Sequence, residues 1–358
     1  MTDRETQIFQ WIKENPMISQ QEIADRANIA RSSVAVHISN LMKKGKIRGK
    51  GYVLQEEDYI TIIGAVAIDI FGVACGDLVN QISNPGRIRT SLGGVGRNIS
   101  ENISRLGKKV ELITVFGDDV YGEEGQRICR NFDIGISHSI TATGEETAKY
   151  LSINNQRGEM YTAVNDMRIL DKLTPGYLQN KTQLINGGGF VIVDTNVSEE
   201  AIRFLADYCT VPIIATPVSI KKAEKLVGVL ERIETITPNK EELAVLSGIQ
   251  IDSERSLEYA VESLLSKGVK ELFVSLGKEG MLYAAGNKRV SYPCLPSESV
   301  NTFGADDAFV SGIAWAKLES LPPEEQARAA LAAVSICIEE EGAISMEMTL
   351  DNLRKRMG

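Results

Sequence analysis

Two adjacent carboxylates, Asp306 and Asp307, open a long alanine-rich helical pattern in the segment 299–312. Gly304 and Ala305 directly precede them. Small residues at a helix start leave backbone N–H groups aimed at one point, where the helix dipole also favours an anion. A carboxylate in that first turn can accept a proton from a hydroxyl group held beside a phosphate. The segment therefore predicts a phosphoryl-transfer site.

The order of these residues resembles the second signature of the ribokinase-type (PfkB) carbohydrate kinases, Asp-Thr-x-Gly-Ala-Gly-Asp-x-Phe. The resemblance implies that Asp307 is the general base that activates the sugar hydroxyl, with Gly304, Ala305 and Asp306 in the anion hole beside it. Two positions depart from the signature, because Asn301 stands where the family has Asp and Asp306 where it has the second Gly. A negative side chain at 306 either points away from the anion hole or weakens phosphate binding.

A second glycine-rich turn, Gly93-Gly94, follows a strand-like run and opens a helical one that carries Asn98. Paired glycines let a backbone approach a ligand closely, and an amide offers both a donor and an acceptor. Such turns are usually only turns, but this one resembles the family's first signature, Gly-Gly-x-x-x-Asn. The resemblance implies that these residues hold sugar hydroxyls together with Asp69, which follows the first strand of the sheet. The other interpretation of Asp69 is a loop residue that caps the next turn.

Asn239 and Glu242 resemble the family's Asn-x-x-Glu motif. A carboxylate and an amide suit Mg²⁺, which prefers oxygen ligands and keeps several of its waters. The resemblance implies that both residues position the metal and that Asn239 also lies beside ATP. The same residues are equally typical of an ordinary helix start.

Ser275, Gly277 and Gly280 close another strand-like run and resemble a family segment whose small residues line the nucleotide phosphates. The resemblance implies ATP contacts there. It also implies that the segment 327–345 flanks the adenine ring and a loop for a monovalent cation such as K⁺.

Within the family, the segments 83–88, 93–99 and 163–167 resemble bacterial pseudouridine kinases. That resemblance implies ATP-dependent phosphorylation of the 5′-hydroxyl of pseudouridine, with Asn84, Asn165 and Asp166 suited to the polar edge of the uracil ring. Two alternatives stay open. One is a nucleoside-sensing transcription regulator whose kinase activity is weak or lost, and the other is a ribokinase-type kinase of another nucleoside or sugar.

Strand-like runs alternate with helical patterns from residue 59 to the end of the chain. The strand-like runs are 59–65, 110–116, 190–194, 212–215, 235–237 and 271–276, and the helical patterns include 95–107, 121–133, 199–208 and 254–267. This alternation predicts an α/β fold, a doubly wound and mainly parallel sheet over residues 59–358. Two segments, 68–92 and 147–165, interrupt it and predict a small β-sheet. In the resembled family such a sheet is a lid over the sugar and often a dimer surface, which implies a homodimer.

The first 55 residues predict three short helices and a hairpin. Thr2 or Asp3 begins the first helix, Ser19 caps the second with Glu22 at capping-box spacing, the third spans about residues 31–44, and residues 46–54 alternate like a hairpin. The pattern resembles a winged helix-turn-helix. It implies that duplex DNA is bound by the residues that follow, on the third helix and the wing: Arg31, Ser32, Ser33, His37, Arg48 and Lys50. The alternative is a helical module that contacts the rest of the chain or another subunit.

Charge separates the two regions, because residues 1–55 carry nine Lys and Arg against five Asp and Glu, and the remainder carries 30 against 43. No run of 18 apolar residues exists and the N-terminus is too polar for a signal peptide, so we expect a soluble, cytoplasmic protein without membrane contact. Five scattered cysteines without a Cys-x-x-Cys pair, together with only two histidines, argue against a zinc site or a histidine-based triad.

Overall fold

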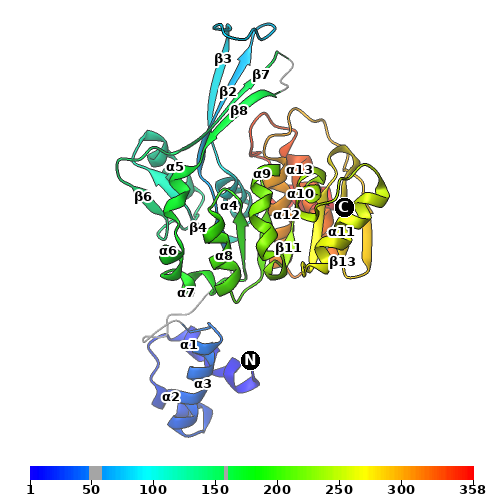
Figure 1. Cartoon of the computed structure of the whole chain (residues 1–358). Coiled ribbons are helices and arrows are strands. Elements are labelled where there is room, and N and C mark those ends of the chain that lie inside the picture. The colour runs from blue at the N-terminus through cyan, green and yellow to red at the C-terminus, as the bar shows by residue number, and fades with distance from the viewer. Residues whose placement is uncertain (48–58, 157–159) are drawn as a thin grey trace. The chain divides into compact units, whose positions relative to one another are not determined.

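The computed structural model describes residues 1–47, 59–156 and 160–358 (Figure 1). Contacts between residues divide the chain into two compact units, 1–58 and 59–358. The boundary agrees with the predicted division between a small basic module and an acidic α/β domain.

The N-terminal unit contains the three predicted helices, α1 (Asp3–Glu14), α2 (Gln20–Ala27) and α3 (Arg31–Lys43). Thr2 and Ser19 each cap a helix through a capping box, so these starts were predicted correctly. Asn28 ends α2 in the left-handed conformation. The helices share an apolar core formed by Ile8, Ile12, Ile18, Ile23, Val34, Ile38 and Leu41. The predicted hairpin at 46–54 lies almost wholly outside the described residues.

The C-terminal unit is built on an eight-stranded sheet. In sequence order its strands are β1 (Tyr59–Ile63), β4 (Lys109–Ile113), β9 (Phe190–Asp194), β10 (Ile213–Thr216), β11 (Thr235–Ile236), β12 (Glu271–Ser275), β13 (Met281–Ala285) and β14 (Lys288–Tyr292). Their spatial order is β14-β13-β12-β11-β10-β9-β1-β4. The six strands from β12 to β4 are parallel, and β13 and β14 add an antiparallel edge.

Helices cover both faces of this sheet, as the alternating pattern predicted. They are α4 (Val95–Arg105), α5 (Val120–Asn131), α6 (Pro175–Gln179), α7 (Thr182–Ile185), α8 (Glu199–Tyr208), α9 (Ile220–Ala223), α10 (Lys240–Ser247), α11 (Glu254–Ser266), α12 (Ala305–Leu318), α13 (Pro323–Cys337) and α14 (Leu350–Met357), with 3₁₀ turns η1 (Arg168–Lys172), η2 (Glu224–Arg232) and η3 (Gly277–Glu279). Neighbouring residues of one strand pack into different clusters: Ile192 lies in the cluster of α4 and α12, and Val193 in that of α8, α10 and α11.

A four-stranded sheet projects from this body (Figure 1). Its strands are β3 (Gly86–Gly93), β2 (Ala67–Ala74), β7 (Ala148–Asn154) and β8 (Met160–Asp166), in that spatial order. We call it the lid sheet. It lies within the predicted segments 68–92 and 147–165 to within a residue at each end.

One predicted strand, 110–116, is two strands in the structure. β4 ends at Ile113, and β5 (Val115–Gly117) leaves the large sheet to pair with β6 (Ile140–Ala142). The division falls at Thr114, whose backbone N–H and C=O bond Ser139 and Ile140 instead of a strand of the large sheet. The apolar sequence continues through this point, so the pattern alone does not reveal the change of sheet.

No helix in the described part of the chain combines the length and the apolar character needed to cross a bilayer.

Candidate active site

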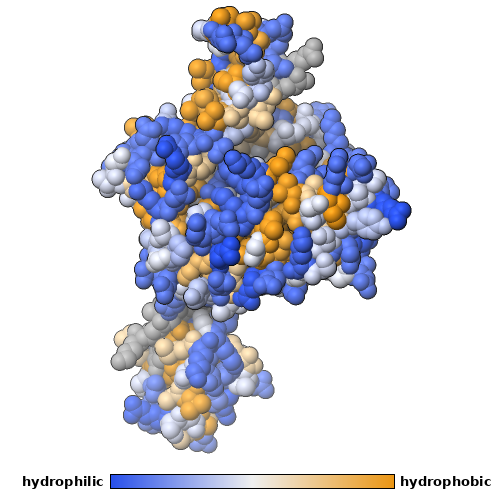
Figure 2. Space-filling model, in the orientation of Figure 1, coloured by the Kyte–Doolittle hydropathy of each residue, from blue (hydrophilic) through white to orange (hydrophobic). Residues whose placement is uncertain are grey.

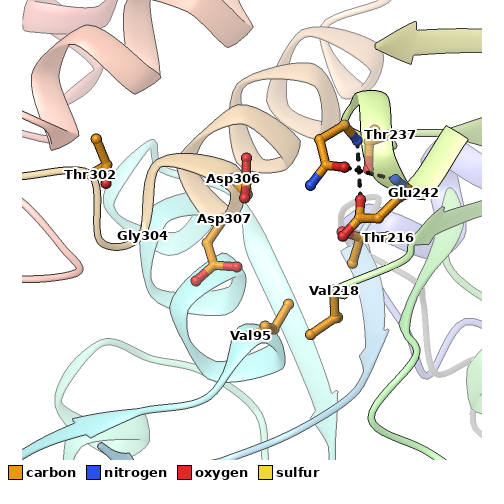
Figure 3. A pocket seen from close by; sticks show the side chains of 10 residues that line it. Val95, Thr216, Val218, Thr237, Glu242, Thr302, Gly304, Asp306 and Asp307 are labelled. Atoms are coloured by element: carbon orange, nitrogen blue, oxygen red, sulfur yellow. Dashed lines mark hydrogen bonds between the residues drawn. The ribbon is translucent and has the colours of Figure 1, made fainter. Parts of the chain in front are cut away.

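A cavity of about 120 Å³ lies where several parallel strands of the large sheet end. It is lined by Val95, Thr216, Val218, Thr237, Asn239, Glu242, Thr302, Gly304, Asp306 and Asp307. Thr216 ends β10 and Thr237 follows β11, so the cavity occupies the crevice at the carboxyl ends of the strands, where ligands bind in open α/β sheets. Figure 3 shows the starts of α12 and α10 facing each other across it.

Gly304 begins α12 with φ of +74°, a conformation that a glycine adopts without strain. A Cβ atom at this position would lie 1.9 Å from the carbonyl oxygen of Ala343. The residue must therefore be glycine for both reasons. Of the first N–H groups of α12, that of Ala305 donates to the carbonyl oxygen of Thr302 at 3.3 Å. Those of Asp306 and Asp307 are in the positions that lack helical acceptors and attract anions.

Asp307 is 8% exposed, and its Oδ2 accepts a hydrogen bond of 2.7 Å from Nδ2 of Asn98. The pKa of Asp307 is raised to about 8, mainly by burial and to a smaller extent by the negative charges of Asp306 and Asp194, while the Asn98 hydrogen bond opposes the rise. Asn98 lies in the first turn of α4 and is itself buried. The structure thus joins the predicted base to a residue of the other predicted signature.

Asp306 lines the cavity with Asp307 and Glu242, so of the two predicted alternatives the side chain does not point away from the site (Figure 3). Its side chain retains an open surface towards the cavity, yet protein surrounds it closely and burial raises its pKa. The negative charge of Asp306 in turn raises the pKa of both neighbouring carboxyls.

Asn239 and Glu242 form a capping box at the start of α10, with Glu242 N–H donating to Asn239 Oδ1 at 2.9 Å and Asn239 N–H donating to Glu242 Oε2 at 3.1 Å. The helix-start interpretation is therefore confirmed. Both residues also line the cavity, and their role as metal ligands stays a prediction. Burial raises the pKa of Glu242 to about 7. Among the described residues no group of three or more His, Cys, Asp or Glu could hold a metal ion. This donor set fits a Mg²⁺ ion that takes one or two carboxylates and otherwise binds phosphates and water.

Asp69 lies in β2, and its carboxyl group packs on Gly93, where a Cβ atom would lie 1.8 Å from Oδ2. Burial raises the pKa of Asp69 to about 6, and the charge of Arg97 opposes the rise. Asp69 pairs in register with Tyr150 of β7, which pairs with Asn165 of β8. Directly paired residues share a face of a sheet, so these three form one polar row across the lid.

Of the predicted nucleotide residues, Asn239 lines this cavity, whereas Ser275, Gly277 and Gly280 do not. Ser275 ends β12 and forms an isolated bridge with Asn239. Gly277 and Gly280, with φ of +59° and +100°, form the turn to β13, in which Leu276 N–H donates to Gly280 O at 2.8 Å. A Cβ atom at Gly280 would lie 2.0 Å from the carbonyl oxygen of Tyr292. The turn therefore brings backbone close to Asn239.

Asn84 and Asp166 have other partners and lie away from the cavity. Asn84 closes a loop near the end of the lid, since its side chain exchanges hydrogen bonds with both backbone groups of Val79 at 2.8 and 2.9 Å. Asp166 is paired with Arg168 at 2.6 Å, which lowers its pKa to about 2. Asn165 lies in the same row of the lid sheet as Asp69 and does not line the cavity.

Sequence reasoning missed Asp194, a fully buried carboxylate at the end of β9. It accepts hydrogen bonds of 2.8 Å from the N–H groups of Ala65 and Asn196, and burial raises its pKa. The signal was present, because it is an aspartate at the carboxyl end of a predicted parallel strand. Val218, which lines the cavity at a φ of +63°, is a β-branched residue in a rare conformation that no sequence pattern indicated.

The predicted DNA-contacting residues of the N-terminal unit lie on α3. Arg31, Ser32 and Ser33 are exposed in its first turn, and His37 is half-buried one turn later. α2, the turn at 28–30 and α3 give the order of a helix-turn-helix. Arg48 and Lys50 lie outside the described residues.

Comparisons with known proteins agree with this geometry. The model of the pfkB family carbohydrate kinases matches residues 57–350, and that of winged helix-turn-helix DNA-binding domains matches residues 1–48. The chain is 38% identical to the "Uncharacterized sugar kinase YeiI" of Escherichia coli (strain K12), over 94% of this chain and 93% of that one. It is 32% identical to the pseudouridine kinase of the same strain, over 84% and 96%. A solved carbohydrate kinase from Agrobacterium tumefaciens, 26% identical, superimposes with a TM-score of 0.71 over 84% and 97%.

Proposed function

This chain belongs to the pfkB family of carbohydrate kinases, which are ATP-dependent phosphotransferases, and we propose that it phosphorylates the 5′-hydroxyl of pseudouridine. The observation that carries the proposal is the placement of Asp307 in the first turn of α12, buried, bonded to Asn98 and next to Gly304. A proton acceptor and an anion-binding helix start then meet at one point.

Asp307 acts as the general base of this reaction. The substrate hydroxyl lies against its carboxylate and transfers its proton there as the oxygen bonds to phosphorus. Gly304 and the N–H groups of Ala305 to Asp307 stabilise the negative charge of the transferring phosphoryl group. Asn98 fixes one carboxylate oxygen and leaves the other for the hydroxyl.

Glu242 and Asn239 would hold Mg²⁺ beside the phosphates, where the ion supplies charge neutralisation. Glu242 lines the cavity, and since its Oε2 accepts the Asn239 N–H, its Oε1 is the oxygen that would meet the ion. Ser275, Gly277 and Gly280 would place backbone against the ATP phosphates from the neighbouring strand end. Together these residues position the phosphoryl donor opposite Asp307.

The lid sheet supports a nucleoside over a bare sugar. Asp69 lies near the start of β2, with Tyr150 and Asn165 beside it in one row. Asp69 would accept hydrogen bonds from ribose hydroxyls, while Asn165 would reach the polar edge of a base. Asn84 and Asp166 would join this recognition only on releasing Val79 and Arg168.

The test is ATP turnover by the full chain with pseudouridine, uridine, inosine, ribose and 2-deoxyribose, followed by mass spectrometry and phosphorus NMR of the product. We expect pseudouridine to have the highest kcat/KM and to yield the 5′-phosphate. A higher kcat/KM for any other substrate on the panel would contradict the assignment and leave the kinase class intact.

A second activity, DNA binding, is favoured by the winged helix-turn-helix match and by the exposed first turn of α3. We propose that the N-terminal unit binds duplex DNA and that the chain responds to its nucleoside. A chain that binds DNA and nucleoside but transfers no phosphate would favour the sensor alternative. Gel-shift titration with and without nucleoside, taken together with the ATP-turnover assay, distinguishes a DNA-binding kinase from a sensor that transfers no phosphate.

The face of the lid opposite to Asp69 supports a homodimer. Two adjacent rows there carry Ile70, Leu151 and Val164, and Ile88 with Ile153. Ile88 is 77% and Val164 65% exposed, and a hydrophobic patch is visible on the lid in Figure 2. A contiguous exposed apolar patch marks an interaction site. Val164→Asp should convert the dimer to monomer in sedimentation velocity, whereas a wild-type chain that is already monomeric would contradict the proposal.

A further inference from the structure

Two loops meet at the start of α12, and hydrogen bonds join them directly. The first is 300–304, which leads into the helix, and the second is 338–343, which follows α13. The N–H groups of Val300 and Asn301 donate to the carbonyl oxygen of Ile338 at 2.8 and 3.3 Å. At the other end, the carbonyl oxygen of Ala343 lies against Gly304. The position of the anion hole therefore depends on how these loops are held together.

The side-chain amide of Asn301 is a central link between them. Its Nδ2 donates a hydrogen bond to the carbonyl oxygen of Glu340, in the second loop. Its Oδ1 accepts a hydrogen bond of 2.5 Å from the N–H of Phe303, in its own loop. A carboxylate could accept the second bond but could not donate the first.

The second loop is where the family resemblance implied a monovalent cation. Such a cation binds carbonyl and carboxylate oxygens and competes for them with hydrogen-bond donors, and here the oxygens between the loops already accept hydrogen bonds. The carbonyl groups of Ile338 and Glu340 accept from the backbone and side chain of Asn301, and those of Phe303 and Ala343 accept weak bonds from Cys337 Sγ at 3.5 Å.

Two of the three glutamates in this loop are engaged with arginines. Glu339 pairs with Arg356 at 2.5 Å, and Glu341 pairs with Arg89 of the lid at 3.0 Å. The described residues of the two loops do not fit a bound monovalent cation.

We propose that the Asn301 amide takes the place of a monovalent cation in joining these loops, so that the fold and the activity of this chain are independent of K⁺. The N–H group of the amide satisfies the Glu340 carbonyl that a cation would otherwise bind. The inference on activity rests on the proposed kinase function, whereas the inference on structure does not.

The test compares the wild-type chain, Asn301→Asp and Asn186→Asp in KCl and in choline chloride at equal ionic strength. Asn186 is a matched control because its amide also joins two backbone groups, donating to Tyr208 O at 3.1 Å and accepting from Thr210 N–H at 2.8 Å, on a remote loop. The first readout is the thermal unfolding midpoint of each chain without nucleotide. The second is the rate of ATP turnover.

We expect the wild-type chain to unfold at the same temperature in both salts and to turn over ATP at rates within about twofold. Asn301→Asp loses the donor and gains a carboxylate, so its midpoint should fall in choline chloride and recover in KCl, and Asn186→Asp should show no such K⁺ dependence. A K⁺-specific rise in the wild-type midpoint would overturn the proposal, even if Asn301→Asp does not fold. Absence of turnover with every substrate would refute the proposed function and leave the thermal comparison decisive.

Discussion

Asn98 of α4 and Asp307 of α12, 209 residues apart in the chain, share a buried hydrogen bond of 2.7 Å. Asn98 Nδ2 is the donor, and in the described part of the chain no partner was found for the buried Oδ1 of the same amide. The first signature thus contacts the proposed base, in addition to its proposed role in substrate binding. Without its neighbour, the carboxylate of Asp307 would be free to rotate and would lose a bond that favours its ionised form.

Asn98→Ala should shift the pH dependence of kcat/KM to higher pH. The Asn98 hydrogen bond lowers the pKa of Asp307, so its loss raises that pKa and a higher pH is needed to ionise the base. The measurement is kcat/KM from pH 6 to 10. Asn102→Ala, a buried amide one turn along the same helix, is the control and should leave the profile in place. An unchanged pH dependence of kcat/KM in Asn98→Ala would exclude a role for Asn98 in positioning Asp307.

Asp307→Asn should lower kcat by about 10² to 10⁴ while nucleoside binding is kept, since a positioned general base contributes about that much. Single-turnover rates and equilibrium binding give the two quantities. Ser311→Ala, one turn further on α12, is the matched control. Wild-type turnover by Asp307→Asn would exclude this residue as the base.

Asp306→Asn should shift the same profile to lower pH and tighten ATP binding. Burial is the main cause of the raised pKa of Asp307, but the charge of Asp306 adds to it, so removing that charge lowers the pKa. Asp306→Gly should have the same effect and restore the family's residue. A clear loss of activity in both variants would show that Asp306 has a positive role, such as holding a cation.

Asp307→Asn should also change how stability depends on pH. The native pKa of Asp307, about 8, lies above its ordinary value of 3.8, so the wild-type chain loses stability as the pH rises between these values. The variant has no carboxyl group to titrate. Urea unfolding at pH 5, 7 and 9 should therefore show that, as the pH rises, the free energy of unfolding of the variant increases relative to that of the wild-type chain, by up to about 1.4 kcal/mol per pKa unit. A difference in the free energy of unfolding that stays constant with pH would mean that the pKa of Asp307 is not raised in the folded chain.

The N-terminal unit should bind duplex DNA with an affinity that falls steeply as salt rises, because bound lysines and arginines displace counterions. Arg48→Ala with Lys50→Ala should weaken binding to all sequences, and changes at Ser32 or Ser33 should alter sequence preference. Removal of residues 1–55 should leave ATP turnover nearly intact. No binding at low salt to DNA upstream of its own gene, with loss of turnover on deletion, would make the unit structural.

The main features of the fold were predictable because they depend on short-range patterns. The strand at 190–194 and the helix at 199–208 were predicted to the residue, since apolar runs and capping residues bound them sharply. The hairpin of β13 and β14 was missed, although its strands alternate around a two-residue turn at Gly286. The family assignment was confirmed, because the glycines and carboxylates of its signatures are contiguous in sequence.

The finer geometry of the site was not predictable, because it depends on contacts between distant segments. Nothing local indicated that Asn98 bonds Asp307, that Asp306 faces Glu242, or that Asn301 bonds a loop 39 residues away. Asn84, predicted to contact the uracil ring, closes its own loop in the structure, since its nearest acceptor, the Val79 carbonyl, is local. Its contact with a uracil ring stays a prediction.

The apolar rows on the lid have a consequence for DNA recognition. If two copies pair through the same face, the pair has a two-fold axis and carries two copies of the N-terminal unit. A symmetric pair of helix-turn-helix units reads the same half-site on opposite strands. The operator of this chain would then be an inverted repeat. Val164→Asp, a change in the lid alone, would reduce occupancy of that operator because it would separate the dimer into two monomers.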